Sequence, residues 1–220
     1  VVVSLGTSGT VFAATTAAVR DATGTVAGFA DATGGILPLV CTLNGAPVLD
    51  TVAALLGVDH DELGKLALQA QPGAGGAVLV PYFEGERTPN LPDATATLAG
   101  LTLANTTRPN LARAAIEGML CGLAAGLDAI RTVGVETGRI LLIGGAAANP
   151  AVQSIAGQVF DLPVHIPSPG EYVADGAARQ AAWVLTGHRP DWPVDLVGSP
   201  VSDVHPIIKE QFAAASAFYN

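Results

Sequence analysis

The sequence predicts a mixed α/β fold in which a sheet is flanked by helices, and three observations support this. Residues 1–12 have the pattern of two apolar strands joined by a Gly/Thr/Ser turn. Residues 107–133 show apolar spacing over the length of one long helix. Residues 139–150 and 164–185 each pass from a short apolar strand into a helix, an alternation typical of α/β domains.

Length and charge restrict the class of protein. With 220 residues, half of them hydrophobic, the chain can bury a core as one large domain or two small ones. The net charge is −9 and the ten basic residues are scattered, so the chain offers no basic patch for nucleic acid. No segment has the roughly 20 uncharged apolar residues that cross a bilayer. We therefore expect a globular protein without a nucleic-acid or membrane partner.

Cysteine and histidine residues are too widely spaced to predict a metal site or a disulfide framework. They are Cys41, Cys121, His60, His165, His188 and His205. We expect buried thiols that fill the core, and imidazoles that are solvated or hydrogen-bonded.

The turn at residues 6–10 suits phosphate binding. Its glycines lack Cβ atoms, so backbone N–H groups can point at phosphate oxygens, and three hydroxyls add donors: Thr7, Ser8 and Thr10. A purely structural hairpin at a sheet edge is the alternative. A P-loop is disfavoured because no Lys follows and the next segment has the pattern of a strand.

The next segment predicts a β meander and two helices. Strands are expected at 28–31 and 36–41, separated by the turn 33–35. A helix over 46–56 ends at Gly57, and a second helix begins at Asp59, which forms a capping box with Glu62, and runs through Gln69.

A buried strand at 77–80 is followed by a loop rich in functional groups at 82–90. Glu84, Glu86 and Arg87 in this loop form either a surface ion-pair cluster or a structural clamp near a substrate cleft. Sequence spacing leaves both interpretations open.

The longest helix is predicted from Thr107 or Arg108, with Pro109 in its first turn, to about Val133. Glycines recur every fourth residue along it, at positions 118, 122 and 126. Each costs about 1 kcal/mol relative to Ala. We expect another backbone to approach this face closely.

A turn of small residues joins the strand at 139–143 to the helix that follows. Asn149 is suited to the N-cap and Pro150 to the first helical position. Such a turn can admit a flat ring, or be only a close strand–helix junction. The unit repeats with a strand at 164–166 and a helix at 173–185, whose small residues 176–178 are expected to face inward. A proline-rich segment and a peripheral helix at 206–219 complete the chain.

Together with these two turns, residues 96–101 (ATLAGL) and 110–117 (NLARAAIE) resemble the C-terminal signature of the FGGY family of sugar kinases. The resemblance implies the actin-like ATPase (ribonuclease H-like) fold, with an ATP-binding C-terminal domain over 1–187 and a separate segment over 188–220. Within the family, residues 85–89 and 100–102 resemble those of the xylulokinases, which phosphorylate D-xylulose with ATP.

The resemblance also implies a nucleotide site. Gly6, Thr7, Ser8 and Thr10 would lie near the β- and γ-phosphates of ATP, while Gly145, Ala146 and Asn149 would lie near adenine and ribose. Gly45 would help to close the cleft. The implied reaction is in-line phosphoryl transfer with Mg²⁺ in a cytoplasmic enzyme, a carboxylate accepting the proton of the sugar hydroxyl.

The chain departs from the whole enzyme of this family. The catalytic Asp of such kinases lies upstream of the phosphate hairpin, before Val1 here, and an N-terminal domain holds most of the sugar. Because Asp21, Asp31 and Asp50 carry no corresponding motif, and the chain starts inside a strand without an initiator Met, we expect a fragment that is inactive alone.

Several alternatives stay open at this stage. Gluconokinase, ribulokinase or a non-catalytic module that binds a nucleotide or a partner protein would also fit the sequence. A homodimer is a further expectation, because apolar surface where the other half would dock can drive self-association.

Overall fold

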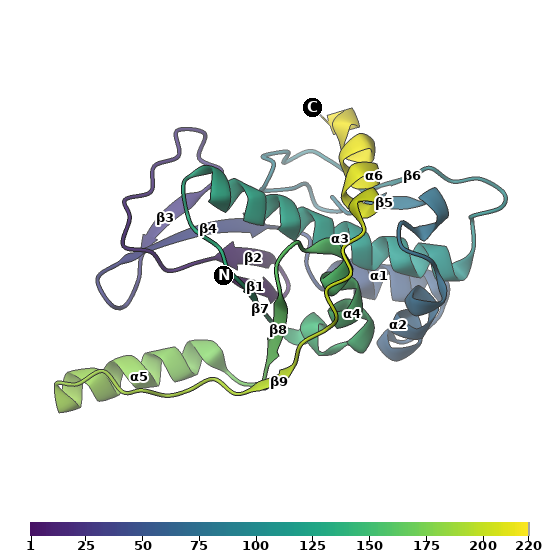
Figure 1. The fold of residues 1–220 in the computed structure, drawn as a ribbon. Helices are drawn as coiled ribbons and strands as arrows, with labels where there is room; N and C mark the ends of the chain where they lie inside the picture. Colours follow the sequence, from purple (N-terminus) through teal and green to yellow (C-terminus); the bar gives the residue numbers. More distant parts are fainter. Residues whose placement is uncertain (220) are drawn as a thin grey trace.

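A computed structural model describes residues 1–219, which form a mixed sheet flanked by helices (Figure 1). The main sheet has the strand order β3-β4-β2-β1-β7-β8-β9. Its strands are β1 (Val2–Leu5), β2 (Gly9–Phe12), β3 (Ala27–Ala30), β4 (Ile36–Thr42), β7 (Ile140–Ile143), β8 (Val164–Pro167) and β9 (Leu196–Gly198). The predicted fold class is confirmed.

Strand β1 lies at the centre, where the sheet changes from antiparallel to parallel. It pairs antiparallel with β2, with Val3 opposite Val11, and parallel with β7, with Val3 opposite Leu142. The short turn at residues 6–8 permits the antiparallel pair, whereas the parallel pair needs a long crossover.

The predicted β meander is wrong. Strand β4 lies between β2 and β3 and pairs antiparallel with both, so β3 forms the edge of the sheet. Burial accounts for this order, because β4 contains Val40, which is 1% exposed, whereas β3 is mostly exposed. The longer and more apolar strand takes the interior position.

The predicted helices are confirmed within one or two residues, except that the last one, predicted over 206–219, ends at Ser216. They are α1 (Pro47–Leu56), α2 (His60–Gln69), α3 (Arg108–Thr132), α4 (Pro150–Val159), α5 (Tyr172–Thr186) and α6 (Pro206–Ser216). Short 3-10 turns at Ala74–Gly76, Gly145–Ala148 and Ala217–Tyr219, and a small sheet of β5 (Val78–Val80) and β6 (Thr97–Ala99), complete the fold. Within residues 1–219, no helix has the length and hydropathy needed to cross a membrane.

Local signals set the helix ends as predicted. Gly57 ends α1 in the left-handed region, at φ 65°. The Asp59 carboxylate accepts a hydrogen bond from the Glu62 N–H (2.8 Å), which is one half of the predicted capping box, and Thr107 caps α3 in the same way.

Helix α3 lies at the centre of the core. It packs against β2 and β4 of the sheet and also contacts α1, α2, α4 and α6 (Figure 1). A buried ion pair fixes its first half, with the Arg113 Nε 2.6 Å from the Glu117 carboxylate. Arg113 also donates to the Ala70 carbonyl at the end of α2, and Glu117 accepts from the Gly73 N–H. One pair of side chains therefore joins α3 to the loop after α2.

The glycine stripe on α3 is only partly explained by close backbone approach. A Cβ at Gly118 would clash with the Leu79 carbonyl on β5, as predicted. At Gly126 it would instead meet the side chains of Val40 (3.1 Å) and Val11 (3.3 Å), and at Gly122 it would find no atom within 4 Å. The expectation for Gly122 is therefore wrong.

Helix α5 stands apart from the other helices, on the opposite side of the sheet from α3 (Figure 1). None of its residues is buried, so the prediction that residues 176–178 face inward is wrong. Apolar side chains are exposed at both of its ends, Val173 by 90% and Leu185 by 87%. The small residues were predicted from a repeat of the preceding strand–helix unit, but only α4 packs against the core.

The last segment is less peripheral than predicted. Strand β9 extends the sheet by pairing antiparallel with β8. Helix α6 contacts α3 and β5, and it buries Ile208 and Phe212. Apolar side chains at helical spacing thus anchor the C-terminal segment on the core.

The glycines of α3 generate a prediction about stability. Gly118→Ala is expected to lower the free energy of unfolding by about 1–3 kcal/mol, because the added methyl group must displace the β5 backbone. The matched variant Gly122→Ala is expected to raise it by about 0.5–1 kcal/mol, since the helix gains propensity and nothing clashes. Urea unfolding measures both, and equal effects would contradict the packing assigned to Gly118.

Candidate functional site

The turn between β1 and β2 presents free polar groups. Thr7 is exposed, and within residues 1–219 the hydroxyls of Thr7, Ser8 and Thr10 have no hydrogen-bond partner. The backbone N–H groups of residues 6–8 likewise donate to no described protein atom. The tip of the hairpin therefore carries several donors that an anion could accept.

The two glycines of this hairpin have different roles. A Cβ at Gly9 would lie 2.5 Å from the Thr42 hydroxyl and 2.7 Å from a methyl group of Leu123, so Gly9 is required by core packing. A Cβ at Gly6 would make only an ordinary contact, 3.5 Å from the Ser8 carbonyl oxygen. Only Gly6 is left to provide open space at the tip.

The loop before α1 lies against the hairpin. The Gly45 N–H donates to the Thr7 carbonyl (3.3 Å), and the Ala46 N–H donates to the Gly6 carbonyl (2.8 Å). A Cβ at Gly45 would lie 2.9 Å from the Thr7 carbonyl oxygen, so the two backbones need a glycine here. The structure thus places Gly45 under the hairpin, while Ala46 is the residue that lines the neighbouring cavity.

A cavity of about 370 Å³ lies between the start of α1, the start of α2 and the turn before α4. The three residues predicted from sequence for adenine and ribose all line it: Gly145, Ala146 and Asn149. The cavity lies next to the hairpin, because Ala46 lines the cavity and its N–H also donates to the Gly6 carbonyl. The hairpin residues and the turn residues are thus brought to one region of the molecule.

The turn before α4, which forms one wall of the cavity, packs closely against β1 at Gly144. Gly144 has φ 99°, and a Cβ there would lie 2.6 Å from the Leu5 carbonyl carbon. Gly145 faces open space and also lines a second cavity of about 480 Å³ on the side of β8 and α5. Ala146 and Asn149 line only the first of the two.

Asn149 has the structural role that its sequence position predicted. Its side-chain oxygen accepts from the Ala151 N–H (2.9 Å) at the start of α4, and its Nδ2 donates to the His60 carbonyl (2.9 Å). Gly64 permits this contact, because a Cβ there would lie 2.7 Å from the Asn149 oxygen. Asn149 therefore joins the starts of α2 and α4, and one of its amide hydrogens remains available.

Glu86 resolves the alternatives left open for the loop at 82–90. Its buried carboxylate accepts hydrogen bonds from the N–H groups of Leu43 (2.7 Å) and Arg87 (2.6 Å) and from Nδ2 of Asn44 (2.9 Å). Neither Glu84 nor Arg87 forms an ion pair among the described residues. The side chain of Glu86 therefore makes the loop a structural clamp, while its place near a substrate cleft stays a prediction.

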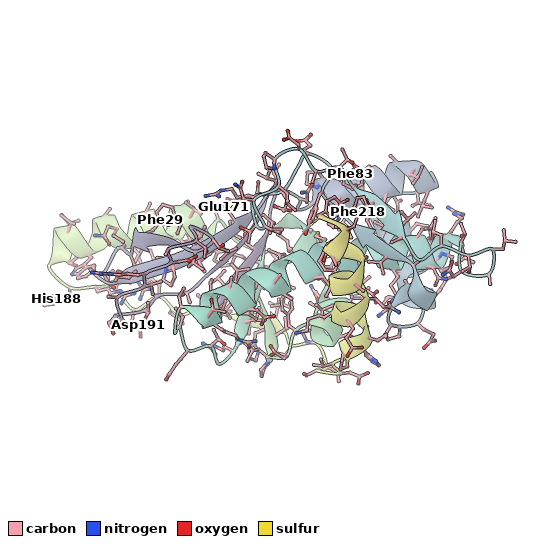
Figure 2. All side chains as sticks on the ribbon, turned by 90° about the horizontal axis from the view of Figure 1, so that it is seen from above. Phe29, Phe83, Glu171, His188, Asp191 and Phe218 are labelled. Carbon is pink, nitrogen blue, oxygen red and sulfur yellow. The ribbon has the colours of Figure 1, made fainter. Side chains whose placement is uncertain are left out.

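Asn44 completes this clamp and was not identified from the sequence. Its Nδ2 also donates to the Gly85 carbonyl (2.7 Å), and its Oδ1 accepts from the Phe83 N–H (3.0 Å). Phe83, which is labelled in Figure 2, is 38% exposed near the start of this loop. Because Asn44 precedes Gly45, the clamp fixes the backbone that supports the hairpin.

Two titratable groups near the clamp have perturbed pKa values. Burial, assisted by the nearby Glu86 carboxylate, raises the pKa of Tyr82 to about 12 and raises the pKa of the Cys41 thiol. Both groups are therefore neutral near pH 7. Cys121 is buried as predicted, whereas Cys41 is only half-buried, because it alternates with the buried residues Val40 and Thr42 along β4.

The carboxylates at 21 and 31 hold loops together. Asp21 accepts hydrogen bonds from the Val26 and Thr23 N–H groups, and these bonds lower its pKa. Asp31 accepts from the N–H groups of residues 33 and 35, with the same effect on its pKa. These carboxylates structure the loops on either side of β3.

Two residues of the cavity wall were missed by sequence reasoning as site residues. Asp50 and His60 both line the cavity, and the His60 Nε2 lies 2.8 Å from the Asp50 Oδ1. The sequence signal for Asp50 is its place one helical turn after Ala46, on the same face of α1. Its pairing with His60 depends on how α1 and α2 pack, which no local pattern shows.

Comparison with known proteins gives a consistent result. The chain matches the C-terminal domain of the FGGY family of carbohydrate kinases over residues 1–185. It is 46% identical over 190 residues to a xylulose kinase of Streptomyces rubiginosus. The aligned region covers 86% of this chain and 38% of the relative. The chain therefore spans less than half the length of such relatives.

Solved structures resemble this fold closely. A xylulose kinase from Bifidobacterium adolescentis is 51% identical with a TM-score of 0.89, over 97% of this chain and 43% of that one. A Plasmodium falciparum glycerol kinase with ADP shares the fold at 18% identity and a TM-score of 0.79, over 99% of this chain and 45% of that one.

The clamp generates a prediction about stability. Glu86→Gln is expected to lower the free energy of unfolding by about 1–3 kcal/mol, because an amide NH₂ would face a buried N–H donor whichever way it is oriented. Glu84→Gln, at an exposed position two residues earlier, is the control and is expected to change it by less than about 0.5 kcal/mol. Thermal unfolding compares the two, and equal midpoints would contradict the clamp.

Proposed function

Because the chain belongs to the FGGY family of carbohydrate kinases, we propose that it is the ATP-binding C-terminal half of a xylulose kinase, which converts ATP and D-xylulose into ADP and D-xylulose 5-phosphate. The observation that carries the proposal is that the hairpin with its free donors lies next to the cavity lined by Gly145. The identities of 46% and 51% to xylulose kinases support the choice of sugar.

The hairpin is proposed to hold the phosphates. Gly6 gives access to the backbone at the tip, and the hydroxyls of Thr7, Ser8 and Thr10 are free to donate to the β- and γ-phosphate oxygens of ATP. Gly45 supports the hairpin indirectly, because its N–H donates a hydrogen bond to the Thr7 carbonyl and so sets the position of the tip. A net charge of −9 makes such local donors necessary for binding an anion.

The cavity is proposed to hold the nucleoside. Gly145 and Ala146 present small surfaces against which a flat purine can lie, and Asn149 has one amide hydrogen left for the ribose. Among residues 1–219 there is no cluster of His, Cys, Asp and Glu that would hold a metal. We therefore expect Mg²⁺ to be bound mainly through the nucleotide phosphates, where it would help to neutralise charge.

Phosphoryl transfer needs a base to accept the proton of the sugar hydroxyl. Asp21 and Asp31 are occupied by the N–H groups of their own loops. We propose that the base and most of the sugar-binding groups come from residues outside this sequence, and that the chain alone does not turn over. We propose that the kinase acts in the cytoplasm.

The outer face of the sheet is proposed to contact that other half. Side chains that alternate with the core residues of β2, β4 and β7 are apolar and only half-buried there: Phe12, Leu39, Leu141 and Ile143. Helix α5 leaves this face without close packing. When the face is uncovered, it can also bring two copies of the chain together as a homodimer.

Nucleotide binding by this chain tests the site directly. Calorimetric titration with ADP and Mg²⁺ is expected to show saturable binding, and Gly145→Leu is expected to weaken it by about tenfold or more, because the new side chain enters the cavity. Gly138→Leu is the control, since a Cβ there also meets nothing within 4 Å but the residue lies away from the cavity. Equal affinities of the two variants for ADP would count against this site.

Kinase activity of the complete polypeptide tests the sugar and the hairpin together. It is expected to phosphorylate D-xylulose faster than D-ribulose or D-gluconate. Thr7→Ala is expected to lower kcat/KM by about 10- to 100-fold through loss of a phosphate donor, without shifting Tm, because the Thr7 hydroxyl bonds to no described residue. Thr7→Ser restores the hydroxyl and should restore most of the rate. An alanine variant with full activity would rule out this role.

A further inference from the structure

We propose that Asp50, oriented by His60, selects the base of the nucleotide by accepting a hydrogen bond from the 6-amino group of adenine. The inference rests on the proposed function, because it assigns specificity within the same nucleotide cavity. It adds two residues that the resemblance did not assign to that site.

Asp50 lines the cavity further along α1 than Ala46 does. Ala46, which bonds to the Gly6 carbonyl, marks the end near the phosphates. Asp50 comes one turn later on α1, about 6 Å further along the helix axis. A nucleotide with its phosphates at the hairpin therefore extends its nucleoside toward Asp50.

His60 holds the Asp50 carboxylate at this position. The imidazole Nε2 lies 2.8 Å from Oδ1, and the backbone of His60 is itself fixed, because its carbonyl accepts from Asn149. The side chains of His60 and Asp50 are 55% and 61% exposed, so both can be reached by a ligand. The second oxygen of Asp50 has no partner among the described residues, and it is free to accept.

The other residues that line the cavity offer few polar groups that could distinguish one purine base from another. Most other lining residues have side chains that neither donate nor accept: Ala46, Leu49, Gly145, Ala146, Ala148 and Pro150. Asn149 is largely used in joining α2 and α4. Asp61 also lines the cavity, but no hydrogen bond within residues 1–219 holds its side chain. Asp50 is thus the one acceptor in this described wall that a second side chain orients.

An ionised carboxylate only accepts hydrogen bonds, and this gives the selectivity its direction. Adenine presents an amino group as a donor at position 6, whereas a 6-oxo purine such as hypoxanthine presents an acceptor that the carboxylate repels. A site built to bond a ligand N–H disfavours the analogue without it, because the protein acceptor is left unpaired.

The test compares ADP with inosine diphosphate (IDP) by calorimetry on this chain. The unchanged chain is expected to bind ADP about tenfold more tightly than IDP, a modest ratio because the pair is half-exposed. Asp50→Asn is expected to reduce the ratio to about twofold or less, because an amide can rotate to donate to the 6-oxo group. The exposed Asp93→Asn, at a residue that does not line the cavity, makes the same change in charge and should keep the ratio.

The outcomes separate this inference from the proposed function. If the unchanged chain binds no ADP, both the nucleotide site and the role of Asp50 are overturned. If it binds ADP and IDP equally, or if Asp50→Asn keeps the ratio, only the role of Asp50 is overturned. Base selection would also be overturned if the unchanged chain bound 2′-deoxy-ADP more weakly than ADP and Asp50→Asn removed this difference. That result would assign the Asp50–His60 pair to the ribose.

Discussion

The burial of α3 is the constraint on which the rest of the structure depends. This helix is buried on nearly all sides, and three of its residues support different parts of the candidate site. Leu123 fills the space that Gly9 leaves beneath the β1–β2 hairpin. Gly118 admits the backbone of β5, the strand that leads into the clamp loop, and Arg113 holds the end of α2 through the Ala70 carbonyl.

The site itself is built largely from backbone held in place by buried polar side chains. The hairpin tip rests on Gly45, and Gly45 follows Asn44, which Glu86 holds from another loop. Asn149 does the same for the cavity by joining the starts of α2 and α4. Among the described residues, this arrangement leaves few side chains free for a ligand: hydroxyls on the hairpin and the Asp50–His60 pair in the cavity, to which we assign ligand binding as a proposal.

Local features were predictable from the sequence because their causes lie within a few residues. Strand alternation fixed the hairpin, and the caps at Gly57, Asp59 and Thr107 fixed helix ends. The insertion of β4 between β2 and β3, the exposure of α5 and the pairing of Asp50 with His60 were missed, because each depends on segments that pack at a distance. The clamp lies between these cases: the loop that contains Glu86 stood out in the sequence, but two partners of Glu86, Leu43 and Asn44, lie more than 40 positions earlier and were not identified.

The central position of β1 also governs the order of assembly during synthesis. Val2 pairs with Leu141, so the parallel half of the sheet waits until about 140 further residues have been synthesised after β1, which takes roughly ten seconds or more at ordinary elongation rates. Until then the edge of β1 that will pair with β7, which runs through Val2, Val3 and Ser4, stays unpaired. Such an edge is open to pairing with other chains. The strand that precedes the proposed phosphate turn is thus also a segment that can mispair with other chains until β7 has been synthesised.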